Sequence, residues 1–191
     1  MTKIYKEKRW NEKLQSLGNI TDKLGMPIDK RIIETVAALN LLGIKTTQSC
    51  EGHLSHGSSY PWVNIGPRYE EKAYNNFIES IRLREKAHKA GKRAASIYKQ
   101  SRELKNKAEK AMLKEFIKVW PLLEEFYGKR KPNLDTQLTV TDVSPTQGNI
   151  RSQGAVFQNI RTQKERKQKL KEYQREMFEF GEFLKQKFLA S

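Results

Sequence analysis

Small and apolar residues recur at alternating steps of four and three residues through the middle of the chain, which is the spacing of a coiled-coil seam. This pattern predicts a long helix over about residues 68–127, and its alanines would let a partner helix approach closely. Gly91 predicts a bend, and Pro121 predicts a kink or break near Val119 because proline clashes with the preceding turn. The seam consists of Leu83, Ala87, Ala90, Ala94, Ile97, Ser101, Leu104, Ala108 and Ala111.

A second seam of large apolar side chains predicts another long helix over about residues 156–189. Two such helices in one chain most simply pair with each other as an antiparallel arm. A homodimer through the alanine seam is the competing arrangement. The residues of the second seam are Leu170, Tyr173, Met177, Phe180, Leu184 and Phe188.

The shorter segments predict a small sheet. Apolar spacing predicts a helix that begins with Asp29 as its cap and ends before Gly43, and a short amphipathic helix before Gly18. Strands are predicted over residues 44–47, 62–65 and 138–143, with residues 149–155 as the returning arm of a hairpin.

We therefore expect an α+β fold, in which a small sheet carries a Cys-His loop (residues 49–60) and long helices form a basic, coiled-coil-like arm. Residues 1–191 would form a single domain. Its α/β core would comprise residues 25–69 and 133–155, and its long helices residues 70–127 and 156–189.

The net charge of +15 at pH 7 is the strongest indication of a partner. Between Arg82 and Lys118, thirteen lysines and arginines stand against four glutamates. Such an excess predicts a surface that neutralises the phosphates of a nucleic acid, and a solvated lysine-rich surface is the simpler alternative. The candidate nucleic-acid-binding residues are Arg82, Arg84, Lys89, Lys92, Arg93, Arg161, Lys164, Arg166 and Lys167.

The sequence also predicts a cytoplasmic protein with no membrane association. No run of eighteen apolar residues occurs, and the first ten residues contain no apolar signal region. The single cysteine excludes an internal disulfide and agrees with a reducing compartment.

Reactive side chains are concentrated between Cys50 and His56, where Glu51 and His53 also lie. A Cys50 thiolate could act as a nucleophile, with His53 as a general acid or base and Glu51 as its partner. The spacing Cys-x-x-His-x-x-His also suits a metal. However, a zinc site needs at least three protein ligands, and Glu51, adjacent to Cys50, would not point the same way. We therefore expect no metal here, and zinc is the less favoured interpretation.

The same segment could instead bind an anion. Its hydroxyl groups and its glycines would let backbone N–H groups converge on an oxyanion. A buried, unreactive cysteine with satisfied histidines is the alternative without a ligand. The candidate anion- or nucleotide-binding residues are Thr47, Ser49, Gly52, His56, Arg68, Arg151 and Ser152.

The run Thr-Thr-Gln-Ser-Cys-Glu-Gly-His over residues 46–53, together with residues 25–40, is similar to the N-terminal part of the wybutosine-synthesis tRNA methyltransferase family. It resembles more closely a group of bacterial and phage-type proteins of uncharacterised function that carry Thr-x-x-Ser-Cys-Glu-Gly-His followed by Pro-Trp-Val. Glu51 stands where the methyltransferases have serine, and His53 where they have arginine. The resemblance implies Ser49, Cys50 and Gly52 as site residues, and S-adenosylmethionine as a cofactor only if it extends to activity.

These observations predict a nucleic-acid-binding protein, with RNA favoured over DNA, that uses the Cys50-Glu51-His53 loop to modify a nucleotide if it is an enzyme. The alternative is a non-enzymatic interaction protein, such as a phage-type inhibitor or a helical adaptor. In that case the basic helices would bind an acidic partner.

Overall fold

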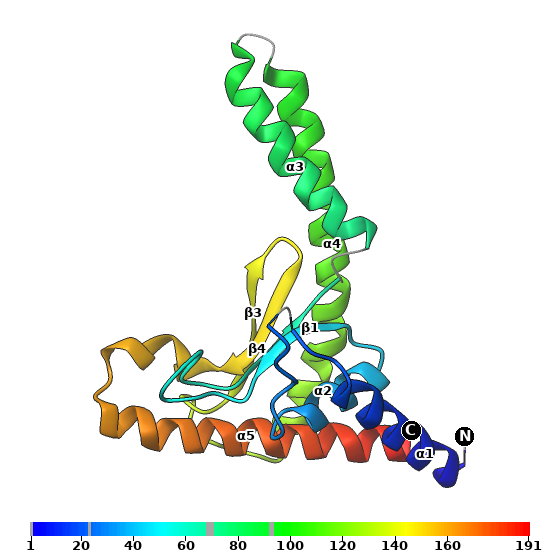
Figure 1. Ribbon diagram of the computed structural model, residues 1–191, viewed down its shortest axis with the longest axis vertical. Helices are drawn as coiled ribbons and strands as arrows, with labels where there is room; N and C mark the ends of the chain where they lie inside the picture. The colour runs from blue at the N-terminus through cyan, green and yellow to red at the C-terminus, as the bar shows by residue number, and fades with distance from the viewer. Residues whose placement is uncertain (1, 23, 68–70, 92–93) are drawn as a thin grey trace.

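Four short antiparallel strands form one sheet in the computed structural model, which describes residues 2–22, 24–67, 71–91 and 94–191 (Figure 1). The strands are β1 (Thr46–Cys50), β2 (Trp62–Ile65), β3 (Leu138–Ser144) and β4 (Gln147–Ser152), in the order β1-β2-β4-β3. Val63 pairs with Ile150, and both side chains are fully buried, so this face of the sheet belongs to the core. The sheet and the long helices confirm the predicted α+β class.

The opposite face of the sheet is polar. Because side chains alternate along a strand, the register places Cys50, Trp62 and Arg151 in one row across β1, β2 and β4. In the next row, the Asn149 side-chain amide donates to Asn64 Oδ1 at 2.7 Å, and both asparagines are buried. The first row begins at the Cys-His loop, so the polar face continues from that loop.

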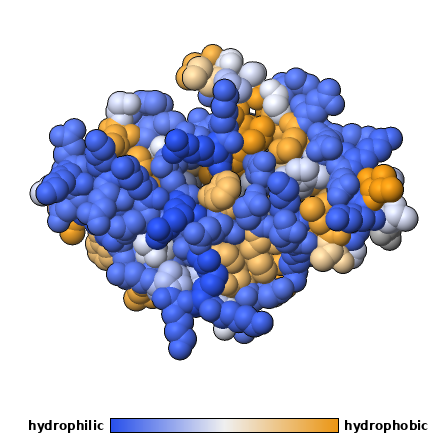
Figure 2. All heavy atoms as spheres, turned by 90° about the horizontal axis from the view of Figure 1, so that it is seen from below, coloured by the Kyte–Doolittle hydropathy of each residue, from blue (hydrophilic) through white to orange (hydrophobic). Residues whose placement is uncertain are grey.

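Helices cover the apolar face. They are α1 (Lys3–Gly18), α2 (Ile33–Leu41), α5 (Gln163–Ala190) and the second half of α4 (Ala94–Tyr127). Seen from below, the molecule is mostly hydrophilic, with separate hydrophobic patches (Figure 2). No helix among the described residues is both long and apolar enough to cross a membrane. The largest fully buried core side chains include Ile32, Leu39, Ile44, Ile65, Ile150, Tyr173, Met177, Phe180 and Leu184.

The arm is a hairpin of α3 (Lys72–Lys89) and α4, and it projects away from the sheet (Figure 1). The predicted pairing of residues 70–127 with residues 156–189 is therefore wrong. The chain reverses near Gly91, whose φ of 55° suits glycine, and α5 crosses the base of the molecule instead.

The alanine seam closes the hairpin. Ala87 and Ala108 are buried, and the Ser101 hydroxyl donates to the Ser80 carbonyl at 2.7 Å. The seam is thus used within the chain, and its surface is no longer available to the competing homodimer.

Several element boundaries differ from the predicted ones. Of the kink or break predicted near Val119, the break is absent, because α4 continues through Pro121 to Tyr127. Asp29 does not cap α2, which begins at Ile33, and β1 extends to Cys50. After β4 the chain forms a 3-10 helix, η2 (Gln153–Ile160), before α5 begins. The expected helix before Gly18 is present as α1 and begins earlier, at Lys3.

Gly181 allows a close contact between α2 and α5. A Cβ atom at this position would lie 2.4 Å from Thr35 Oγ1, and the Thr35 hydroxyl donates to the Met177 carbonyl at 3.4 Å. Glycine normally weakens a helix interior, so its presence in the middle of α5 reflects this contact between the two helices.

We predict that Gly181→Ala lowers the free energy of unfolding by about 1–3 kcal/mol, because overpacking outweighs the gain in helix propensity. Gly18→Ala is the matched control. Nothing lies within 4 Å of an added Cβ there, so the change should be neutral or stabilising by up to about 1 kcal/mol. Urea denaturation followed by circular dichroism measures both, and equal effects of the two changes would contradict the packing argument.

Candidate functional site

The loop between β1 and β2 turns back on itself at Gly52. The φ of Gly52 is 87°, and an added Cβ would lie 2.7 Å from both the Tyr60 backbone and the Leu170 side chain. No other residue type fits this conformation and this space. The turn is closed by the His53 N–H, which donates to the Ser58 carbonyl at 2.6 Å. Cys50, at the end of β1, and His53 are thereby held on the same side of the loop.

Asp29 completes this pair from a distant part of the sequence. Its Oδ2 accepts a hydrogen bond from the Glu51 N–H at 2.9 Å and lies 3.3 Å from His53 Nε2. Cys50 Sγ, His53 Nε2 and an Asp29 carboxylate oxygen all lie within 4.8 Å of one another. The sequence interpretation missed Asp29 as a site residue because it assigned that residue to a helix cap. Its only signal was its place in the run of residues 25–40 that carries the resemblance.

Glu51 does not join this cluster. Its carboxylate accepts a hydrogen bond from the Arg31 N–H at 2.9 Å, in an exposed position. Gln174 of α5 donates to the Glu51 and Gly52 carbonyls at 3.0 and 3.2 Å, which fixes the loop to the helix. The structure therefore brings Cys50 and His53 together with Asp29, and not with the Glu51 side chain.

The environment of Cys50 does not favour a thiolate nucleophile. Burial raises the pKa of the Cys50 thiol, and the Asp29 and Glu51 carboxylates raise it further. Backbone N–H groups of Gly52 and Ser58 act in the opposite direction, but the pKa stays above its usual value. The protein groups alone thus keep Cys50 protonated at neutral pH, which disfavours the nucleophile interpretation.

Three successive backbone donors at the Gly52 turn are already used within the protein. The Glu51 N–H binds Asp29, the Gly52 N–H donates to Cys50 Sγ at 3.3 Å, and the His53 N–H binds Ser58. These three groups therefore do not converge on an external oxyanion, and the Asp29 carboxylate is the anion that the first of them binds.

His56 lies over His53 rather than beside Cys50. The two imidazole rings stack with centroids 4.2 Å apart, and His56 Nδ1 lies 3.0 Å from the Ser55 hydroxyl. His56 is exposed, so it forms the outer wall of the site.

A pocket of about 630 Å³ lies along the edge strand β1. Thr47 and Ser49 line it, as predicted residues of an anion site, together with Trp62 and residues of the loop before α2. Ile28 and Ser49, which precede Asp29 and Cys50 in the sequence, are among its lining residues, whereas Asp29, Cys50 and His53 are not.

The other predicted site residues are dispersed. Arg151 lies across the sheet, where its guanidinium donates to the Tyr60 hydroxyl at 3.3 Å. Ser152 is fully buried on the core side of β4, so it cannot contact a ligand. Arg68 lies outside the described residues.

The predicted nucleic-acid-binding residues form two groups. Arg82, Arg84 and Lys89 lie on the arm, and Lys164, Arg166 and Lys167 lie in the first turns of α5, at a distance from the arm (Figure 1). Lys92 and Arg93 lie outside the described residues.

Arg161 belongs to neither group, because its side chain is bound within a cluster of polar groups that stabilises the fold. Its guanidinium binds both Asp135 and the Tyr173 hydroxyl. Asp135 also accepts from Tyr173 at 3.1 Å and pairs with Lys169 at 3.0 Å. Burial alone would raise the pKa of Asp135, but the hydrogen bonds from Lys169, Arg161 and Tyr173 hold it below its usual value.

Comparisons of the chain with known protein families, with curated proteins and with solved structures found no match. The function must therefore be inferred from the residues and their arrangement.

We predict that Asp135→Asn destabilises the protein by about 1–3 kcal/mol at neutral pH, because Arg161 and Lys169 lose their charged acceptor. A carboxylate with a lowered folded-state pKa contributes stability above its unfolded pKa of about 3.9 and loses that contribution as the pH falls through the folded value. The difference between the two proteins should therefore shrink below about pH 4.

The measurement is urea denaturation of both proteins across a pH series. Asp142→Asn is the control, since Asp142 is exposed and has no ion pair among the described residues. A difference that stays constant down to acid pH would contradict the assignment to Asp135.

Proposed function

We propose that the protein binds nucleic acid, RNA in preference to DNA, along the arm formed by α3 and α4. The observation that carries this proposal is the set of unpaired cations on the arm. Ion pairs involve Arg82, Lys105 and Lys118, whose partners are glutamates three or four residues away. The exposed cations of the arm without an ion-pair partner among the described residues are Lys72, Arg84, Lys86, Lys89, Lys99, Arg102, Lys107, Lys110 and Lys114.

Unpaired cations of this density raise the free energy of the isolated protein through mutual repulsion, and a polyanion relieves it. Phosphates bound by such side chains release condensed counterions, which is the main sequence-independent source of affinity. The arm extends away from the sheet, so both of its helices can contact one extended strand.

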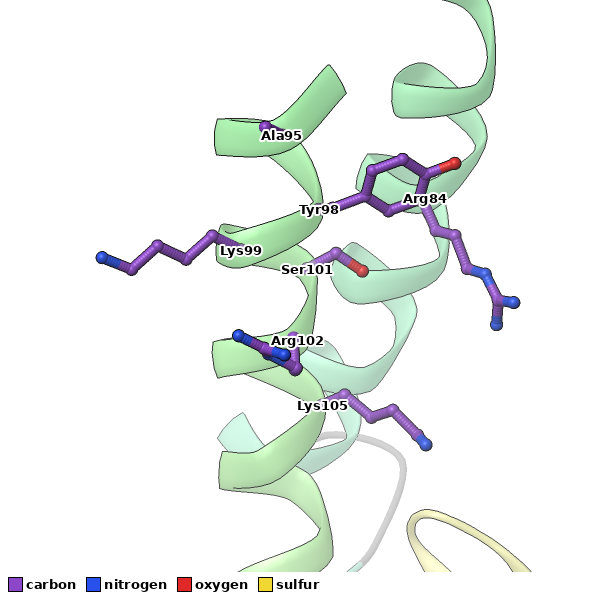
Figure 3. Close-up of a pocket in the computed structure, with 7 residues that line it drawn as sticks. All are labelled: Arg84, Ala95, Tyr98, Lys99, Ser101, Arg102 and Lys105. Carbon is purple, nitrogen blue, oxygen red and sulfur yellow. The ribbon is translucent and has the colours of Figure 1, made fainter. Parts of the chain in front are cut away.

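A shallow pocket of about 490 Å³ lies between the two helices of the arm (Figure 3). Arg84 from α3 and Lys105 from α4 extend to the same side of the hairpin, and Arg102 and Lys99 extend elsewhere around it. Tyr98 lies among them, 39% exposed, and its hydroxyl lies 3.1 Å from His88 Nδ1. A partly exposed aromatic ring among cations suits base stacking beside phosphate contacts, which an acidic protein surface would not require.

The preference for RNA rests on the resemblance of residues 46–53 to a tRNA-modifying family. It is separable from nucleic-acid binding itself, so the experiment compares RNA and DNA of one sequence.

We predict that the protein binds a fluorescent single-stranded RNA with an affinity that falls steeply as salt increases. The double variant Arg84→Ala and Arg102→Ala should bind at least about tenfold more weakly. For this variant, the slope of log affinity against log salt concentration should be shallower by about 0.7 for each phosphate contact that is lost. Fluorescence anisotropy over a series of KCl concentrations measures both quantities.

Lys8→Ala is the matched control, because Lys8 is an exposed cation of α1, away from the arm, whose nearest carboxylate is 3.9 Å away. Equal losses from the control and the double variant would overturn the assignment to the arm. Absence of RNA binding at low salt would instead support the acidic-partner alternative. Equal affinity for DNA would refute only the RNA preference.

A further inference from the structure

We propose that Asp29, Cys50 and His53 form a zinc site with one coordination position left for a ligand that is not a protein side chain. This inference is independent of nucleic-acid binding, because it uses none of the residues of the arm. It reverses the expectation drawn from the sequence, in which Glu51 had to serve as the third ligand.

The geometry of the three donor atoms fits a tetrahedral ion. Ligand atoms about 2.0–2.1 Å from a tetrahedral zinc lie roughly 3.3 Å apart, and Asp29 Oδ2 and His53 Nε2 are 3.3 Å apart. Cys50 Sγ lies within 4.8 Å of both, so a small movement of its side chain would bring all three donors to bonding distance. Asp29 thus joins Cys50, at the end of β1, and His53, in the loop after it, from a separate segment of the chain.

The chemistry of the donors selects the metal. A thiolate sulfur, an imidazole nitrogen and a carboxylate oxygen together are the ligands of zinc and similar borderline cations. Magnesium and calcium take oxygen ligands almost entirely, so the sulfur and the imidazole argue against both.

The groups around the donors hold them in place, as they do at established metal centres. The Glu51 N–H orients the Asp29 carboxylate, and the Gly52 N–H points at Cys50 Sγ. Gln174 fixes the loop backbone through the Glu51 and Gly52 carbonyls. A His–Asp ion pair alone would not need the sulfur, the glycine turn and this backbone support to converge on one point.

Three protein ligands are the number found at zinc sites that bind water or substrate, whereas structural sites use four. The His53 and Asp29 side chains are 22% and 30% exposed, so the ion would be accessible from solvent.

The test uses the full chain, stripped of metal with a chelator and titrated with Zn²⁺. We expect one equivalent to bind and to raise the melting temperature by mass action. Titration with Co²⁺ should give a thiolate-to-cobalt charge-transfer band and the intense visible bands of a four-coordinate ion. A chain that binds no Zn²⁺, or a cobalt spectrum without the thiolate band, would overturn the proposal.

Variants then assign the ligands. Asp29→Asn, Cys50→Ser and His53→Gln should each weaken Zn²⁺ binding by at least about 100-fold, beyond the range of about 10–100-fold that the loss of an outer hydrogen bond causes. Glu51→Gln and His56→Gln should retain one equivalent. A loss with either control as large as with the ligand variants would refute this ligand set, and circular dichroism of each metal-free variant excludes unfolding as the cause. If a ligand variant does not fold, the cobalt spectrum of the wild-type chain still decides the proposal.

Discussion

Burial of one face of α5 is the interaction on which the rest of the structure depends. Met177, Phe180, Leu184 and Phe188 are almost fully buried along this face, and they join α2, the sheet and the second half of α4 into one core. Burial of such side chains contributes roughly 1.5–3 kcal/mol each relative to exposure. The same helix carries Gln174, which holds the Cys-His loop by its backbone. The position of the candidate site is thus set by the helix that forms the core.

The helices could be predicted from the sequence because their signal is local. Apolar periodicity is contained within each helix. The seams of α4 and α5 could therefore be recognised in the sequence without any knowledge of the elements that they pack against. The apolar spacing of a seam, however, predicts only that the helix packs against another element, and it does not identify that element. The chain provides a partner for α4 only a few residues away, beyond Gly91, and a hairpin closes a much shorter loop than pairing with α5 would. The glycine that we interpreted as a bend is the turn of that hairpin.

The cluster of Asp29, Cys50 and His53 was predicted only in part, because one of its contacts is not local in the sequence. Cys50 and His53 are three residues apart, so their meeting follows from local sequence and the Gly52 turn. Asp29 is separated from them along the sequence by α2 and most of β1. A contact between residues so far apart in the sequence leaves no periodic pattern from which it could be predicted. An aspartate two residues after a proline also has a local interpretation as a helix cap, and that interpretation was wrong because the helix begins at Ile33. A third ligand of this kind becomes visible only when the fold is known.

The distribution of charge connects the two proposals without making either depend on the other. The protein as a whole is strongly basic, yet the candidate site brings the Asp29 carboxylate to a loop that holds Glu51 and Cys50. A phosphate attracted to the arm would be repelled from that loop, so a cation-free site would be a poor place for a nucleotide. A divalent cation held by Asp29, Cys50 and His53 would reverse the sign of the local field and become its dominant charge. The acidic loop in a basic protein is therefore the arrangement expected if the metal, rather than the protein, meets the anionic ligand.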